Sequence, residues 1–256
     1  MKFFTKRAFT KKTLLIVVIF TIIINCLSLY STIIKDNFYA DTLQSPWTDN
    51  IIVLPDTASF INMVYIFILA GSVLADTFVK DRQTGLVNII ASKENYTKYV
   101  RQTIIYNMII VGLLSVIPSI INLILWFCFR PDVPLVYFNT MNLNNILLFG
   151  EVFLKSKILF FVLHLIKISI LAMTVSNFSL FVNTVFNNRY LGTPIAFILD
   201  NIFYLIFLGM NWGIISLNLL MTSLYYPDLL TIFIFLLYNC LALFYFYKYS
   251  HKKDVL

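Results

Sequence analysis

The sequence predicts an all-α, polytopic membrane protein with six transmembrane helices, and composition and patterning both lead to this fold class. Of its 256 residues, 60% are hydrophobic and 12% are charged, and the mean hydropathy is +0.85. A soluble domain of this length cannot bury so much apolar surface, whereas a lipid bilayer can cover it. The apolar residues fall into separate runs near the ~20 residues that a helix needs to cross ~30 Å of hydrocarbon. Basic residues cluster between these runs.

The first apolar run, residues 14–34, follows a basic start at residues 1–12 that carries phenylalanines among lysines. The run is long and has no small-x-small cleavage site, so we interpret it as a retained first span and not as a signal peptide. Pro194, directly after Thr193, suits the first turn of the fifth helix. The later spans are predicted at residues 60–75, 103–129, 158–182, 193–210 and 229–247. Together they form one membrane domain over residues 1–256.

The stretch at residues 193–226 is too long for one crossing, since at ~1.5 Å per residue it would reach roughly 50 Å. Asn211, Trp212, Gly213 and Asn218 interrupt it without adding a charge. We therefore expect residues 211–227 to form a re-entrant hairpin before the last span, which is tolerated where protein covers the exposed backbone. A tilted helix followed by an apolar extracellular loop remains the alternative.

Charge asymmetry predicts the orientation. Basic residues gather in residues 1–12, residues 76–103, Arg189 and the tail from Lys248. The alternate loops hold few basic residues and most of the acidic ones. Because cytoplasmic loops carry the excess of Lys and Arg, both termini are expected in the cytoplasm of a multi-pass protein of the cell membrane. The same distribution argues against nucleic acid as a partner, since the formal charge of +7 is not gathered on a polar domain face.

The chain shows no motif for catalysis. No glycine precedes a lysine, so a phosphate-cradling loop cannot be built, and the H-E-x-x-H and G-x-S-x-G patterns do not occur. Cys26, Cys128 and Cys240 lie inside apolar runs and are interpreted as packing residues, not as disulfides or metal ligands. His164 and His251 are too far apart to suggest a shared zinc site. We expect no catalytic, cofactor-binding or metal-binding residues in this chain.

The most informative segment is the predicted cytoplasmic loop at residues 76–103. Residues 81–91 can form a short helix that carries an apolar side and a polar side. Such a division is expected of a helix that lies against a partner. The residues expected at this contact are Asp81, Arg82, Gly85, Leu86, Ile89 and Ile90.

This arrangement resembles the permeases of the type-2 ABC exporters. The shared features are Asp76 at the end of the second span, the charged stretch 81–85 ending in glycine, an apolar turn, a polar break and a Tyr/Lys/Arg-rich lead into the third span. Six spans, cytoplasmic termini, the basic amphipathic start and the re-entrant element extend the resemblance over the chain. One departure is the break itself, where the family often has Pro and Arg and this chain has Ser92, Lys93 and Glu94.

The resemblance implies that the 81–91 helix is a coupling helix seated in a cleft of a separate cytoplasmic ATPase. It also implies two copies of that ATPase, which hold ATP and Mg, and a second copy of this chain. Composition and compact loops look like two-component peptide exporters of Gram-positive bacteria, of the phenol-soluble modulin or lantibiotic type. An amphipathic peptide, exported as a toxin or removed for immunity, is the expected substrate.

Two charges lie inside predicted spans, Lys167 in the fourth and Asp200 in the fifth. Each alone would cost roughly 3 kcal/mol at the bilayer centre, so each should face the bundle interior or a wet cavity. They can form a pair that fixes helix register, or a gate that contacts a charged substrate. An ion-coupled secondary transporter that uses this pair is therefore an alternative function. An accessory membrane protein, such as a sensor or assembly factor, is another.

Overall fold

The computed structural model describes residues 2–35, 45–47, 49–50, 57–93, 96–134, 150–209 and 229–250. Every regular element in this part of the chain is a helix, so the prediction of an all-α fold is confirmed. The predicted re-entrant element at residues 211–227 lies outside the described residues. The helices are α1 (Lys2–Ala8), α2 (Lys11–Lys35), α3 (Thr57–Ser72), α4 (Ala75–Gln83), α5 (Leu86–Lys93), α6 (Tyr96–Ser115), α7 (Ile117–Phe129), α9 (Gly150–Lys155), α10 (Lys157–Val185), α11 (Gly192–Gly209) and α13 (Leu229–Ser250).

Four stretches of the described residues are helical, long and apolar enough to cross a membrane. They are Lys11–Ser31, Thr57–Gln83, Tyr96–Phe129 and Lys157–Val185, and they match the first four predicted spans. These stretches give the chain the character of a membrane protein. The predicted fifth and sixth spans fall on α11 and α13. That these two helices also cross the bilayer stays a prediction.

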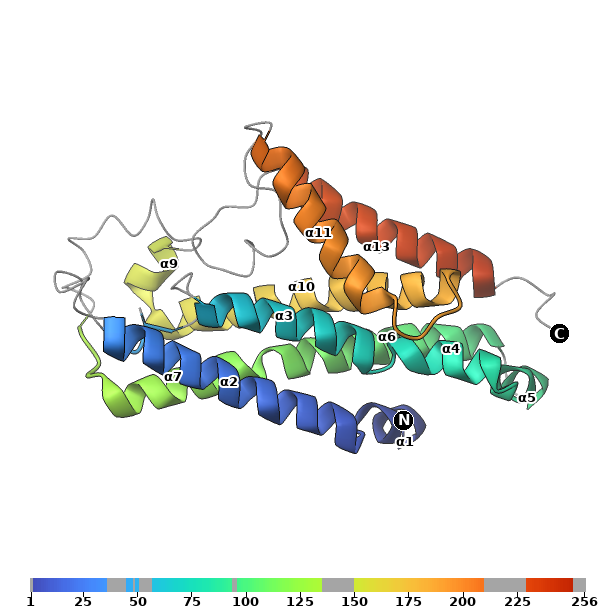
Figure 1. The fold of residues 1–256 in the computed structure, drawn as a ribbon, viewed down its shortest axis with the longest axis horizontal. Helices are drawn as coiled ribbons and strands as arrows, with labels where there is room; N and C mark the ends of the chain where they lie inside the picture. The colour runs from blue at the N-terminus through green and yellow to red at the C-terminus, as the bar shows by residue number, and fades with distance from the viewer. Residues whose placement is uncertain are drawn as a thin grey trace.

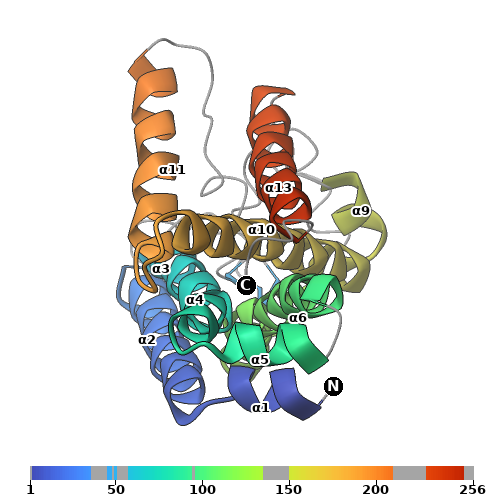
Figure 2. The same cartoon turned by 90° about the vertical axis from the view of Figure 1, so that its right-hand side faces the viewer.

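The helices form an elongated bundle in which α10 is central. It contacts α3, α4 and α6 on one side and α11 and α13 on the other. Figure 2 shows α11 and α13 rising apart from each other above α10, while α2, α3, α4 and α6 gather below it. In Figure 1, α1, α5 and the C-terminal end of α13 lie at the same end of the bundle. The opposite end carries α9 and the far ends of α2 and α7.

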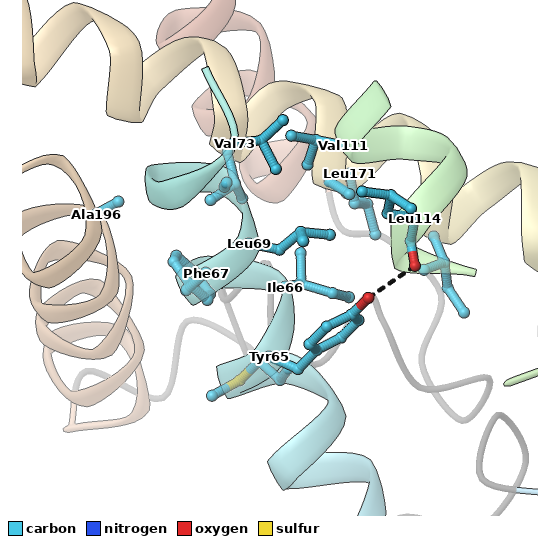
Figure 3. Packing of buried hydrophobic residues seen from close by; sticks show 14 of the residues in the cluster. Tyr65, Ile66, Phe67, Leu69, Val73, Val111, Leu114, Leu171 and Ala196 are labelled. Carbon is cyan, nitrogen blue, oxygen red and sulfur yellow. Dashed lines mark hydrogen bonds between the residues drawn. The ribbon is translucent and has the colours of Figure 1, made fainter. Parts of the chain in front are cut away.

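Pro118 explains why the predicted third span is divided into α6 and α7. Proline has no backbone N–H, so the carbonyl of Leu114, four residues earlier, loses its helical partner. The Tyr65 hydroxyl of α3 donates a 2.8 Å hydrogen bond to that carbonyl, shown as the dashed line in Figure 3. Both residues are buried in the main apolar cluster. The bond therefore satisfies a polar group that has no access to water and fixes α3 against α6.

Other buried polar side chains form hydrogen bonds between helices. The Asn122 amide of α7 donates to the Asn25 side chain of α2 at 3.0 Å. The Asn107 amide of α6 donates to the hydroxyl of Ser176 in α10 at 2.5 Å. Because lipid offers no competing partners, each of these bonds sets the register of one helix pair. Hydropathy alone gave no indication of these pairings.

The end of the bundle away from α1 is held by ion pairs and by a hydrogen bond from a tryptophan. Arg130 and Asp49 form an ion pair at 3.3 Å, and Lys157 and Asp132 form another at 2.5 Å. The Trp47 indole donates to Asp132 at 3.1 Å. Asp132 therefore joins the segment around Trp47 to the start of α10.

We expect the two ends of the bundle to lie on opposite sides of the membrane. In a variant lacking Cys26, Cys128 and Cys240, a cysteine at Pro134 should react with an impermeant thiol reagent added to intact cells. A cysteine at Asn88 in α5 should react only after the cells are opened. Both positions are exposed, so access to the side chain does not limit either reaction. Labelling of Asn88→Cys but not Pro134→Cys in intact cells would reverse the topology.

Candidate functional site at the α4–α5 junction

The segment predicted as one helix over residues 81–91 is two helices, so that prediction is wrong in this respect. α4 ends at Gln83, and the N–H groups of Thr84 and Gly85 donate to the carbonyls of Lys80 and Arg82. Gly85 has φ +73°, a left-handed conformation that glycine adopts without a Cβ penalty, and this closes α4. α5 begins again at Leu86. The break lets α5 take a direction of its own at the end of the bundle, as Figure 1 shows.

Asp81 does not lie at an exposed rim beside Arg82, as the sequence suggested. Its side chain is 1% exposed, whereas Arg82 is exposed. The guanidinium of Arg7 in α1 binds both carboxylate oxygens, at 2.7 Å for the Nη2–Oδ1 contact. The Tyr99 hydroxyl of α6 donates to Oδ2 at 2.6 Å. Asp81 is therefore a buried connection between α1, α4 and α6, and its carboxylate faces the bundle and not a partner protein.

The ion pair between Arg7 and Asp81 favours the charged form of Arg7. The hydrogen bond to Asp81 raises the pKa of the Arg7 guanidinium above its ordinary value, against the opposing effect of burial. Arg7 is thus always charged, and the fork of the guanidinium matches the carboxylate at two points. The sequence analysis identified Arg7 only as one of the basic residues of the N-terminal cluster and did not predict its pairing with Asp81.

Aromatic packing surrounds the ion pair. Tyr99 stacks on Phe78 of α4 and on Phe4 of α1, with ring centroids 6.1 and 6.0 Å apart. Phe246 of α13 meets the edge of Phe78 at 6.1 Å, and Val87 of α5 is buried in the same cluster. We call these five residues, Phe4, Phe78, Val87, Tyr99 and Phe246, the junction cluster. Through this cluster α1 packs on α6 and α13 packs on α4, so the first and last described helices are joined to the same group of residues.

The two sides of α5 differ in exposure. Val87 is buried and Ile90 packs against the junction cluster. Leu86 is partly exposed and Ile89 is 53% exposed. Positions three apart share a face of a helix, so Leu86 and Ile89 form the outer apolar pair and Val87 and Ile90 the inner one. Of the predicted apolar contacts, Leu86 and Ile89 keep exposed surface, and Ile90 packs mainly into the fold.

A second connection joins α4 to the turn between α10 and α11. The side chain of Gln83 accepts from Arg189 at 2.6 and 2.9 Å and donates to the carbonyl of Asn187 at 3.2 Å. At the other end of α4, the Asn183 amide donates to the carbonyl of Ala75 at 3.1 Å. α4 is thereby fixed at both ends to the segment that leads into α11.

The side chain of Asn183, in α10, also holds the first residue of α11 in place. Its side-chain oxygen accepts the N–H of Gly192 at 2.6 Å, and the Ser179 hydroxyl donates to the carbonyl of Gly192 at 3.3 Å. Sequence reasoning did not single out Asn183 or Gln83. The available signal for Asn183 was a polar residue in an apolar run nine residues before a glycine that precedes a helix start.

Lys167 and Asp200 lie on the adjacent helices α10 and α11. Lys167 is partly buried, and Asp200 is 2% exposed. That each of these charges faces the bundle interior or a wet cavity stays a prediction. The ion pair between the two residues stays a prediction.

Within the described residues, no group of three or more His, Cys, Asp or Glu side chains could hold a metal ion. Cys26, Cys128 and Cys240 carry free, exposed thiols. No family model matches the chain, and neither a curated protein nor a solved structure matches it.

Proposed function

We propose that this chain is the membrane subunit of an ATP-driven exporter of the type-2 ABC class, in which α5 docks on a separate ATPase. The observation that carries this proposal is the construction of α5. Its outer side presents the exposed Ile89 beside Leu86, while its inner side is embedded in the junction cluster. A short helix that is apolar outside and rigidly held inside is suited to receive force from a partner.

The two connections of α4 give the force a route into the bundle. A push on α5 moves α4, because the two helices are adjacent and share the junction cluster. α4 then carries α1 through Asp81 and Arg7, and it carries the start of α11 through Gln83 and Asn183. Motion of packed helices as units is an ordinary form of conformational change. The chain can therefore couple to ATP hydrolysis without holding ATP and Mg itself.

In the proposed assembly, two copies of this chain pair with two copies of the ATPase. Six spans cross the cell membrane, both termini are cytoplasmic, and α4 and α5 lie on the cytoplasmic side. The two permeases together form the path for an amphipathic substrate, which we propose to be a peptide exported as a toxin or for immunity. The basic clusters at residues 1–12 and 76–103 support this orientation.

An ion-coupled secondary transporter is the second candidate, favoured by the burial of Asp200 in an apolar helix. A carboxylate in that setting can take up and release a proton during transport. Purification in mild detergent separates the classes. An ATPase that elutes with the chain supports the exporter, whereas proton- or sodium-dependent flux without an ATPase supports the secondary transporter. An accessory protein gives neither result.

The docking role of α5 is tested by placing a charge on its outer side. Full burial of an aliphatic side chain contributes about 1.5 to 3 kcal/mol, so Leu86→Asp with Ile89→Asp should release the ATPase and abolish export. The same variant should still insert, because α5 keeps its inner side. Co-purification of the ATPase and substrate efflux from membranes are the two measurements.

Asn88→Asp is the matched control for Ile89→Asp, because it adds the same charge at the neighbouring exposed position of α5. It should retain the ATPase. Arg82→Ala should have a mild effect, because solvent screens an exposed charge. If the double variant keeps its ATPase and still exports, α5 is not the coupling element.

A further inference from the structure

The outer side of α1 and the first turn of α2 form a basic surface beside an apolar one. Lys6, Phe9, Lys11 and Lys12 are exposed, and Phe9 is 48% exposed. We call these four residues the basic face. Phe4, Arg7 and Ala8 point the other way and hold α1 to the protein.

A short break in the helix creates this surface. The Thr10 hydroxyl accepts the N–H of Thr13 at 3.1 Å and so caps the start of α2. α1 therefore turns away from the axis of α2, and Figure 2 shows it crossing the end of the bundle below α5. The sequence predicted an amphipathic basic start, and the structure divides its aromatic residues: Phe4 is buried and Phe9 is exposed.

The charges on the basic face are not balanced by neighbours on the same elements. The first 35 residues contain no acidic residue. Among the described carboxylates nearby, Asp81 binds Arg7, and Asp76 of α4 interacts electrostatically with Lys12. Asp76 also faces Lys80 and Arg189, so it balances only a fraction of this charge. An anion of considerable charge density suits this surface.

The position of the basic face on α2 indicates what kind of anion binds there. Immediately after Lys12, the exposed side of α2 becomes apolar, with Leu14, Leu15 and Val18 at 48%, 58% and 56% exposure. A row of lysines followed within one turn by exposed aliphatic side chains matches the order of headgroup and acyl chain in a phospholipid. A nucleic acid or an acidic protein surface would leave these exposed aliphatic side chains of α2 without an apolar partner.

We infer that the basic face is a binding site for anionic phospholipid. Lys6, Lys11 and Lys12 contact the headgroup phosphates, and Phe9 lies at the level of the upper acyl chains. The inference rests on the membrane character of the chain and not on the proposed export function. Arg7, on the inner side of α1, binds Asp81 of α4. The same short helix therefore contacts the lipid on its outer side and α4 on its inner side.

The experiment uses the full chain in mixed vesicles of phosphatidylcholine and phosphatidylglycerol. Phe9→Trp serves as a reporter, and the fluorescence of the parent chain, with its own tryptophans, is subtracted. One lipid at a time carries bromine on its acyl chains, which quenches tryptophan on contact. Brominated phosphatidylglycerol should quench the reporter at least threefold more than its mole fraction predicts, and added salt should reduce this excess.

Removing the lysines tests whether they form the lipid-binding site. Lys6→Gln, Lys11→Gln and Lys12→Gln together should bring quenching by phosphatidylglycerol down to the level of its mole fraction. The charge-matched control is Lys80→Gln, Lys98→Gln and Arg101→Gln, which removes three exposed basic residues from α4 and α6 and should keep the excess. Soluble glycerol phosphate should not compete, because it lacks acyl chains. Equal quenching by both lipids, equal loss in the two triple variants, or displacement by glycerol phosphate would overturn the inference.

Discussion

Arg7→Met is expected to damage the protein more than the double change of Arg7→Met with Asp81→Leu. The single change leaves a carboxylate that is 1% exposed and still accepts a hydrogen bond from the Tyr99 hydroxyl, but no longer has the Arg7 guanidinium beside it. Breaking a buried ion pair by removing one partner costs about 3 to 5 kcal/mol. The double change removes both charges and replaces them with apolar groups, so it should recover most of this loss.

Asp81→Leu alone should be intermediate. It leaves Arg7, whose side chain is 26% exposed and can reach water, but it also removes the acceptor of Tyr99. Arg82→Met is the matched control, because it removes the same charge from an exposed position next to Asp81. It should cause a much smaller loss than Arg7→Met, because the charge that it removes is exposed to solvent.

Two measurements follow these variants. One is the temperature at which half of the detergent-solubilised protein aggregates. The other is the rate of tryptic cleavage after Lys11 and Lys12, which should rise when α1 is released from α4. If Arg7→Met matches Arg82→Met in both, or if the losses of the two single variants simply add in the double variant, Arg7 and Asp81 do not act as a pair.

Gly192→Ala is expected to open the contact between α10 and α11. A Cβ at this position would lie 2.4 Å from the backbone oxygen of Ser179 and 2.9 Å from Oδ1 of Asn183. The backbone of α10 cannot yield as a side chain can, so α11 must move. The strain of overpacking is about 1 to 3 kcal/mol, and loss of the bond between the Gly192 N–H and Asn183 adds a similar amount.

Gly112→Ala provides the comparison in α6. A Cβ there would meet the tip of Met173 and the hydroxyl of Ser169, and the methionine can change rotamer. The aggregation temperature should therefore fall clearly more for Gly192→Ala than for Gly112→Ala. Equal shifts would mean that the approach of α11 to α10 is not as tight as the structure shows.

Gly192→Ala should also weaken coupling, because Asn183 joins the start of α11 to the first residue of α4. At a temperature at which the variant is still folded, export should fall while the ATPase remains bound. Loss of both together would place the defect in folding.

The sequence was sufficient for the features that depend on runs of residues. Hydropathy located the first four long helical stretches, with ends that differ from the structure by up to eight residues, because a span is a property of about twenty consecutive side chains. The break at Gly85 could have been expected as well, since a glycine after a polar residue commonly ends a helix. The prediction of a continuous helix over residues 81–91 gave too much weight to amphipathic spacing.

The features that depend on distant residues could not be predicted. Asp81 was expected at an exposed rim because nothing in residues 76–103 shows that Arg7, 74 positions earlier, binds it. The hydroxyl of Tyr65 and the carbonyl freed by Pro118 are likewise 49 positions apart. Such pairs are fixed by packing between helices, which a single sequence without related sequences does not encode locally.

Site-directed crosslinking from Ile89 tests whether α5 docks on an ATPase. A photoreactive amino acid at position 89, on the outer side of α5, should form an adduct in intact membranes with a protein that binds ATP. The same amino acid at Ile124, which is 59% exposed on α7 at the other end of the bundle, should not form it. An adduct from position 89 whose partner is labelled by a photoreactive ATP analogue is the predicted result. No adduct at position 89, the same adduct from both positions, or a partner that does not bind ATP would show that α5 does not dock on an ATPase.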